Sequence, residues 1–166
     1  KAELDWLDPI TITADTTGVQ IPPVENSPVV YRLNHPMEDG EYFLVEHRNQ
    51  QGFDQTLVES GILIWHLDST VISNNMNSNS VNNNEPHFGV GLEQADGNNH
   101  LENGVNRGDN GDPFPGSSSN ITFDDNSTPN SHSHDLLPSF IAVSNISISD
   151  TFALADFGPG QAASVA

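Results

Sequence analysis

The chain has 166 residues, of which 34% are hydrophobic, enough for one domain but too few apolar residues for two independent cores. Its 4 basic and 23 acidic residues give a formal net charge of −19. Nucleic acid and anionic membrane surfaces are therefore excluded as expected partners, because both require a basic surface. Such a chain repels itself without counter-ions, so divalent cations are the expected partners and solubility in salty medium is the alternative explanation.

The sequence contains no cysteine, which excludes disulfides, thiolate metal sites and cysteine nucleophiles. Bacterial exported proteins often lack disulfides, and metal ions can then supply the missing cross-links. No stretch is apolar enough for a transmembrane helix, and no signal peptide is found. Because the chain begins at Lys1 rather than at methionine, we expect it to be a piece of a longer protein.

The first thirty residues predict little regular structure. Residues 1–8 have the apolar spacing of a helix end, and Pro9 prevents its continuation. Residues 10–12 alternate as a strand does. Residues 18–30 contain three prolines, so we expect a turn and extended chain there rather than a helix.

Two central strands are predicted at residues 41–48 and 61–68. Both runs are rich in β-branched and aromatic residues. Within each run the odd-numbered residues share one face and the even-numbered residues the other, and both faces are largely apolar. We therefore expect two neighbouring antiparallel strands inside a sheet, joined by the polar connection at residues 49–60.

Asparagine, serine, aspartate and glycine dominate two later segments. Residues 73–85 are a low-complexity run that predicts a mobile surface loop. Residues 88–96 resemble a further strand. The next segment, residues 97–135, we call the long loop; a loop of this length in a compact domain needs something to organise it.

The last part of the chain predicts a strand pair at residues 138–149 and 151–157, followed by a linker-like tail at 158–166. The expected fold is mainly β: an antiparallel β-sandwich or a small barrel-like domain with long Asn/Asp/Gly loops and little helix. Residues 1–157 are expected to form this single domain.

No recognisable catalytic motif is present. A zinc peptidase helix needs two histidines one turn apart with a glutamate beside the first, and the sequence has no HExxH. No GxSxG turn supports a serine nucleophile either. His132 and His134 are the one close pair of histidines; they suit either a transition metal or, as we expect, an ordinary solvated loop.

Residues 91–116 are dense in oxygen donors. Calcium takes six to eight hard oxygen ligands, and glycine lets the backbone fold round an ion. Asp109 and Asp112 lie three residues apart on a turn made by neighbouring glycines, and we predict that they bind calcium. Asp96 and Glu93 are the further candidate ligands. The alternative is an Asn/Asp/Gly turn region with no ion.

A second polar group consists of Glu46, Arg48, His66 and Asp68 on the two central strands. If the strands pair, each couple projects to one side of the sheet and the two sides may coincide. Such a group is a metal site, an acid–base pair or, as we expect, a satisfied buried polar network.

Six runs of the sequence, in their order and spacing, form a distinctive set: AELDWLDP (2–9), EYFLVEHRNQQGFD (41–54), GILIWHLD (61–68), GVGLEQADGNNHLENG (89–104), NRGDNGDPFPG (106–116) and NISIS (145–149). Together they resemble the immune inhibitor A family of secreted bacterial metallopeptidases. At residues 46–49 the chain has EHRN where the family usually has ENRQ, and it lacks the family's Pro-Gly turn near Val58.

The resemblance implies a place in a larger enzyme. In this family the HExxH helix lies N-terminal to a segment like AELDWLDP, so the chain would follow the zinc-binding subdomain and pack beside it. The implied function is a secreted, calcium-stabilised domain that does not hydrolyse peptides by itself, with zinc only in the missing subdomain. The alternative is a free-standing secreted β-sandwich module that binds carbohydrate or attaches to a surface.

Overall fold

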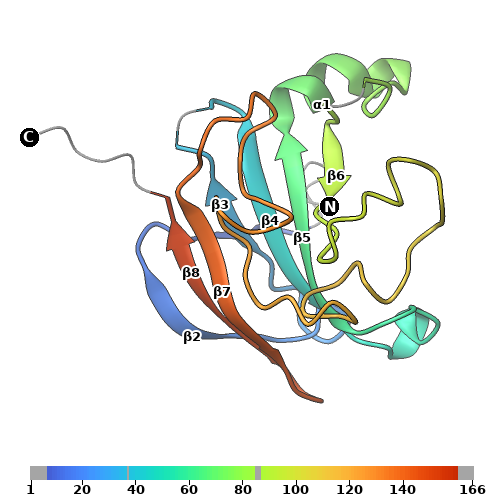
Figure 1. Ribbon diagram of the computed structural model, residues 1–166, viewed down its shortest axis with the longest axis vertical. Coiled ribbons are helices and arrows are strands. Elements are labelled where there is room, and N and C mark those ends of the chain that lie inside the picture. Colours follow the sequence, from blue (N-terminus) through green and yellow to red (C-terminus); the bar gives the residue numbers. More distant parts are fainter. Residues whose placement is uncertain (1–6, 37, 85–86, 161–166) are drawn as a thin grey trace, which may run out of the picture.

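Two β-sheets pack face to face in the computed structural model, which describes residues 7–36, 38–84 and 87–160 (Figure 1). The strand order is β1-β3-β4-β5-β6 in one sheet and β2-β8-β7 in the other. The predicted mainly β, sandwich-like fold is confirmed, and the sheets do not close into a barrel. The strands are β1 (Ile10–Thr11), β2 (Thr16–Ile21), β3 (Tyr31–Asn34), β4 (Glu41–Arg48), β5 (Gly61–Asp68), β6 (Val90–Leu92), β7 (Ile141–Ile148) and β8 (Ala153–Pro159).

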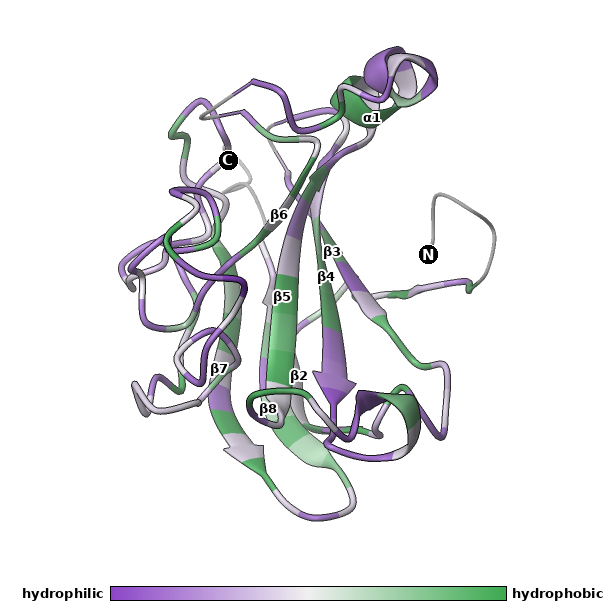
Figure 2. Cartoon of the chain, turned by 90° about the vertical axis from the view of Figure 1, so that its right-hand side faces the viewer, coloured by the Kyte–Doolittle hydropathy of each residue, from purple (hydrophilic) through white to green (hydrophobic). Residues whose placement is uncertain are grey.

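The centre of the larger sheet is the β4–β5 pair. The two strands are antiparallel and in register from Glu41 opposite Asp68 to Arg48 opposite Gly61, as predicted. Both are central strands, since β3 pairs with β4 and β6 pairs with β5. Hydrophobic stretches run along both strands in Figure 2, and their two faces contribute to two different apolar clusters. The two-sided apolar pattern therefore predicted their position correctly.

The main core lies between the sheets and includes two aromatic residues from the long loop. Phe114 exchanges two backbone hydrogen bonds of 2.9 Å with Ile62 of β5, and Phe123 pairs in the same way with Val143 of β7. Both rings are fully buried, and Phe123 meets Phe43 edge to face at 5.1 Å. The long loop is thus fastened to both sheets by apolar anchors.

The other face of the larger sheet is covered in part by helix α1 (Ser69–Asn75) and the 3-10 turn that follows it, Met76–Ser78. Asp68 caps the helix, because its Oδ1 accepts hydrogen bonds from the backbone N–H groups of Thr70 and Val71. Ile72 is buried in the cluster on this face. The prediction of a mobile loop over residues 73–85 is therefore wrong for its first six residues, where the cap and the buried Ile72 outweigh low helix propensity.

Other predicted elements differ mainly in their bounds. The strand expected at residues 88–96 is shortened to β6, and β2 occupies the beginning of the extended segment at residues 18–30. Strand β3 was not predicted. The helix end expected at residues 1–8 lies almost wholly outside the described residues; Leu7 and Asp8 are not helical.

The C-terminal strand pair is confirmed, with β7 and β8 antiparallel. Strand β8 runs to Pro159, two residues past the expected end of the domain at residue 157. None of the helices formed by the described residues has the length and apolar character that crossing a membrane requires.

His47 makes the stability of this core depend on pH. Its ring is fully buried, Nδ1 donates to the carbonyl of Ile21 at 3.1 Å, and Nε2 has no hydrogen-bond partner. Burial lowers the pKa of His47 below its ordinary value of 6.5, despite the opposing hydrogen bond to Ile21. Around and below pH 6.5, His47 is therefore protonated in the unfolded chain but stays neutral in the folded chain.

We expect the contribution of His47 to the free energy of unfolding to fall as the pH drops below about 6.5, the pKa of an unfolded histidine. His47→Asn keeps a donor for the Ile21 carbonyl but removes the titrating ring. It should be less stable than the wild type at pH 8 and should lose less stability on acidification. Urea unfolding at several pH values from 8 to 5 gives the change of the free energy of unfolding with pH for the wild type and for the variant. Equal changes in the two proteins would show that His47 is not the titrating group.

Candidate metal site in the long loop

Three of the four residues predicted to bind metal lie around Gly111, where ligand atoms of Asp96, Asp109 and His100 are within 4.8 Å of one another. Asp96, Asp109 and Asp112, the carboxylate cluster, surround Gly111. A methyl group at Gly111 would collide with Oδ2 of Asp96 and would lie 3.1 Å from Oδ1 of Asp109. Backbone hydrogen bonds join the two sides of the cluster, from Asp96 N to Gly111 O and from Ala95 N to Asp112 O. The glycine is therefore required for the close approach of these carboxylates.

Asp109 is held by local donors. Its Oδ1 accepts from the backbone N–H of Gly111 at 2.8 Å, and its Oδ2 accepts from the amide of Asn106 at 2.6 Å. His100 Nδ1 lies 3.3 Å from the same Oδ2. The Gly111 N–H and His100 lower the pKa of Asp109, so this carboxylate stays charged.

Asp112 is the least satisfied member of the cluster. Its side chain is buried; Oδ2 accepts from Asp109 N at 2.6 Å, but Oδ1 has no hydrogen-bond partner. Burial raises the pKa of Asp112, and repulsion from Asp109, Asp96 and Glu102 raises it further. A buried carboxylate oxygen without a partner is costly unless a cation or a proton neutralises it.

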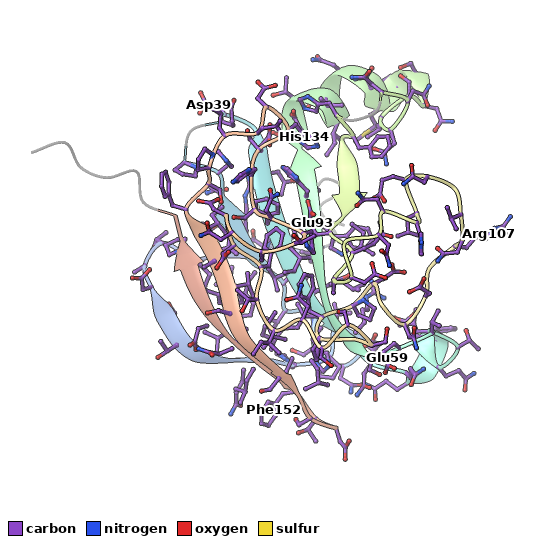
Figure 3. All side chains as sticks on the ribbon, viewed as in Figure 1. Asp39, Glu59, Glu93, Arg107, His134 and Phe152 are labelled. Atoms are coloured by element: carbon purple, nitrogen blue, oxygen red, sulfur yellow. The ribbon has the colours of Figure 1, made fainter. Side chains whose placement is uncertain are left out.

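No side-chain cation of the chain fills this role among the described residues. Arg107, the basic residue of the long loop, is exposed and extends outward at the rim of the molecule (Figure 3). His100 forms an ion-pair contact with Asp109, and its ligand nitrogen lies within 4.8 Å of one oxygen each of Asp96 and Asp109. The cluster thus keeps an excess of negative charge around the buried oxygen of Asp112.

The donors of the cluster suit calcium better than a transition metal. Three carboxylates, the amide oxygens of nearby asparagines and the carbonyls of a glycine-rich turn are hard oxygen ligands, which calcium prefers. His100 would remain outside such a coordination shell, because imidazole suits zinc, copper or nickel. The unpaired Oδ1 of Asp112 and the crowding around Gly111 both fit a bound cation.

Glu93, the fourth predicted ligand, lies elsewhere. Its Oε1 is 3.3 Å from Nδ1 of His66, at the wall of a groove of about 570 Å³ next to β6. Glu102 and His134 also line this groove. Figure 3 places Glu93 over the middle of the larger sheet, well away from the outer rim of the long loop marked by Arg107. Glu93 therefore serves as a partner of His66 in the structure.

The predicted group of Glu46, Arg48, His66 and Asp68 does not form. Phe43 pairs with His66 across the strands, so His66 and Asp68 lie on the inner face and Glu46 and Arg48 on the outer face. On that outer face Glu46 Oε1 accepts from Arg48 Nε at 3.1 Å and from Trp65 Nε1 at 3.2 Å. The expectation that the two sides coincide is wrong, whereas Glu46 and Arg48 do form a satisfied network.

His132 and His134 also separate. His132 Nε2 lies 4.0 Å from Asp125, whereas the side chain of His134 is only 9% exposed and packs between the rings of His66 and His87. The prediction of an ordinary solvated loop is therefore wrong for His134. Glu41 and His87 lie next to His134 in the structure. They were not predicted as site residues, because they are far from His134 and from each other in the sequence.

Asp125, in the second half of the long loop, is held by hydrogen bonds from the protein itself. Its Oδ1 accepts from Ser131 Oγ at 3.0 Å and from the backbone N–H of Ser139 at 2.9 Å, while Oδ2 accepts from the N–H of Phe140. These bonds lower the pKa of Asp125 against the effect of burial. In the first half of the loop, by contrast, the buried Oδ1 of Asp112 has no hydrogen-bond partner.

Comparison of the chain with models of protein families, with curated proteins and with solved structures finds no match.

Proposed function

We propose that this chain is the non-catalytic, calcium-stabilised β-sandwich domain of a secreted zinc metallopeptidase. The observation that carries the calcium part is the buried, unpartnered Oδ1 of Asp112 beside Asp96 and Asp109. The metallopeptidase part is supported by the resemblance of residues 41–54, 61–68 and 106–116 to the immune inhibitor A family. Its partner would be the catalytic subdomain of the same parent chain.

The alternative, a free-standing module for carbohydrate or surface attachment, gains little from the groove. Sugar platforms use exposed aromatic rings, and the groove has Phe88 but neither tryptophan nor tyrosine in its lining. The exposed Phe53 lies on a separate turn after β4.

Calorimetric titration tests the calcium site directly. Extracellular calcium modules bind with dissociation constants of about 10⁻⁴–10⁻³ M, and we expect the chain to fall in this range. Asp109→Asn with Asp112→Asn keeps the size and shape of both side chains but removes their charge, and should abolish binding. Asp135→Asn, which removes an exposed charge elsewhere in the same loop, is the matched control and should leave binding unchanged.

The chain should not cleave peptides by itself, since HExxH is missing. The purified chain is incubated with a general protein substrate and with zinc. The cleavage activity of each chromatographic fraction is then compared with the amount of the chain in that fraction. Metal-dependent cleavage that follows the chain through purification would overturn this prediction. Cleavage that separates from the chain would identify a contaminant.

A further inference from the structure

Three histidine rings form a column at the end of the β4–β5 pair nearest helix α1. The ring of His134 stacks on His87, with centroids 4.2 Å apart and planes inclined by 6°, and its other side meets His66 at 4.1 Å. Figure 3 shows His134 near this end of the larger sheet. The three residues come from β5, from the segment before β6 and from the long loop.

Carboxylates surround this column. Oε2 of Glu41 lies 2.9 Å from Nε2 of His66 and accepts the backbone N–H of His134 at 3.1 Å. Asp68 Oδ2 lies 2.7 Å from Nε2 of His87. Burial by itself raises the pKa of Glu41, but its contacts with His134 and His66 outweigh burial and hold the pKa well below the usual range. Glu41 is therefore a buried carboxylate that stays ionised.

His134 brings a buried ring nitrogen against Glu41. Its Nδ1 lies 3.2 Å from Oε2 of Glu41, an ion-pair contact without hydrogen-bond geometry. The side chain of His134 is more than nine-tenths buried. A buried imidazole nitrogen therefore lies at close range to a carboxylate, with no well-formed hydrogen bond that fixes its position.

We propose that Glu41, His87 and His134 bind a divalent transition-metal ion, with zinc as the first candidate. One ligand atom from each of the three side chains lies within 4.8 Å of the other two. Two imidazoles and one carboxylate form a donor set that zinc uses and calcium does not. Ligand atoms around a tetrahedral zinc with bonds of about 2.0–2.1 Å lie roughly 3.3 Å apart, so the side chains close inward by about 1.5 Å at most.

The outer partners of the site match those of a metal-bound histidine. A ligating histidine usually donates its second ring N–H to a carboxylate, which fixes the tautomer. Asp68 holds Nε2 of His87, and with the proton there Nδ1 carries the lone pair that a metal requires. His87 is about one-third exposed, so its ring can turn towards the ion without disturbing the core.

The site would act as a cross-link in a chain without cysteine. Its three ligands belong to the first residue of β4, to the segment between α1 and β6 and to the long loop. Binding an ion there ties these segments together in the folded state only, so the metal should stabilise the fold by mass action. This site is independent of the proposed calcium site, since the two share no residue.

Titration of the chain with zinc and with cobalt, in saturating calcium, tests the proposal. Calcium keeps the carboxylate cluster occupied, and cobalt bound by imidazole gives a visible absorption spectrum. We expect one zinc per chain, a cobalt spectrum of low symmetry and a higher melting temperature with zinc. His87→Gln and His134→Gln should each weaken zinc binding by more than the roughly 10–100-fold typical of losing an outer partner.

His132→Gln is the matched control, because His132 is two residues from His134 but lies against Asp125. It should bind zinc as the wild type does. If His134→Gln folds poorly, His87→Gln keeps the test decisive, because the side chain of His87 is about one-third exposed. Zinc binding that survives His87→Gln, that depends on His100 instead, or that is absent from the wild type would overturn the proposal.

Discussion

Replacing Phe114 by alanine should destabilise the chain by about 3–5 kcal/mol, the usual cost of removing a fully buried phenylalanine side chain. The ring is 0% exposed and meets Phe123 edge to face. Its backbone pairs with Ile62, so the side chain and the main chain fasten the long loop to the centre of β5. Urea unfolding followed by the fluorescence of Trp65, measured in calcium and in chelator, gives the change in free energy.

Phe53→Ala provides the control for Phe114→Ala. Phe53 is fully exposed, and its replacement should change stability by no more than about 0.5 kcal/mol. Phe114→Leu should have an intermediate effect, because it keeps most of the apolar volume. A cost for Phe114→Ala no larger than that for Phe53→Ala would show that the long loop is not held by the core.

Loosening this anchor should also weaken calcium binding. Phe114 follows Asp112, a member of the carboxylate cluster, by two residues. The carbonyl of Asp112 also accepts a hydrogen bond from the backbone N–H of Ala95, next to Asp96. In Phe114→Ala the loop is less ordered before calcium binds. Part of the free energy of binding is then used to order the loop. Calcium affinity should therefore fall although no ligand has been changed, and calorimetry measures this fall.

The sequence predicted those strands whose pattern is local and strong. Strands β4 and β5 are apolar on both faces over eight residues, which leaves a central pair as the simplest arrangement. Strand β3 has four residues and follows a segment rich in proline, so its short pattern carries little information. Phe114 was not predicted as a core residue for a related reason. It stands between two prolines in a run of glycine, aspartate and serine, where a buried side chain is not expected.

The candidate sites differ in the same way. Asp109 and Asp112 lie on one glycine-flanked turn and Asp96 stands just before the same loop, so that their closeness follows from local sequence. Glu41, His87 and His134 come from three distant segments that meet only after the sandwich has formed. Even with β4 and β5 paired correctly, the face on which His66 lies depended on the register opposite Phe43. The position of His134 depended on the path of the long loop, which no sequence pattern specifies.

Calcium at about 10–100 mM, which is roughly 100 times a dissociation constant of about 10⁻⁴–10⁻³ M, should raise the melting temperature of the wild type markedly. In chelator, Asp96, Asp109 and Asp112 repel one another and the Oδ1 of Asp112 lacks a partner. Calcium removes both penalties. At about 100 times the dissociation constant, mass action contributes roughly 2.7 kcal/mol. For a chain of this size that corresponds to a shift of roughly 5–11 °C. Magnesium should shift the melting temperature much less, because it demands stricter octahedral geometry and gives up its water reluctantly.

The Asp109→Asn, Asp112→Asn double variant separates calcium binding from a general effect of salt. It should not respond to calcium, and in chelator it should melt at the same temperature as the wild type or higher, since two repelling charges are gone. Asp135→Asn removes a charge that lies outside the cluster and should keep the full calcium shift. Equal melting temperatures of the wild type in calcium and in chelator would refute the calcium site. A shift that persists in the double variant would place the ion elsewhere, because Asp112 supplies the buried oxygen on which the site depends.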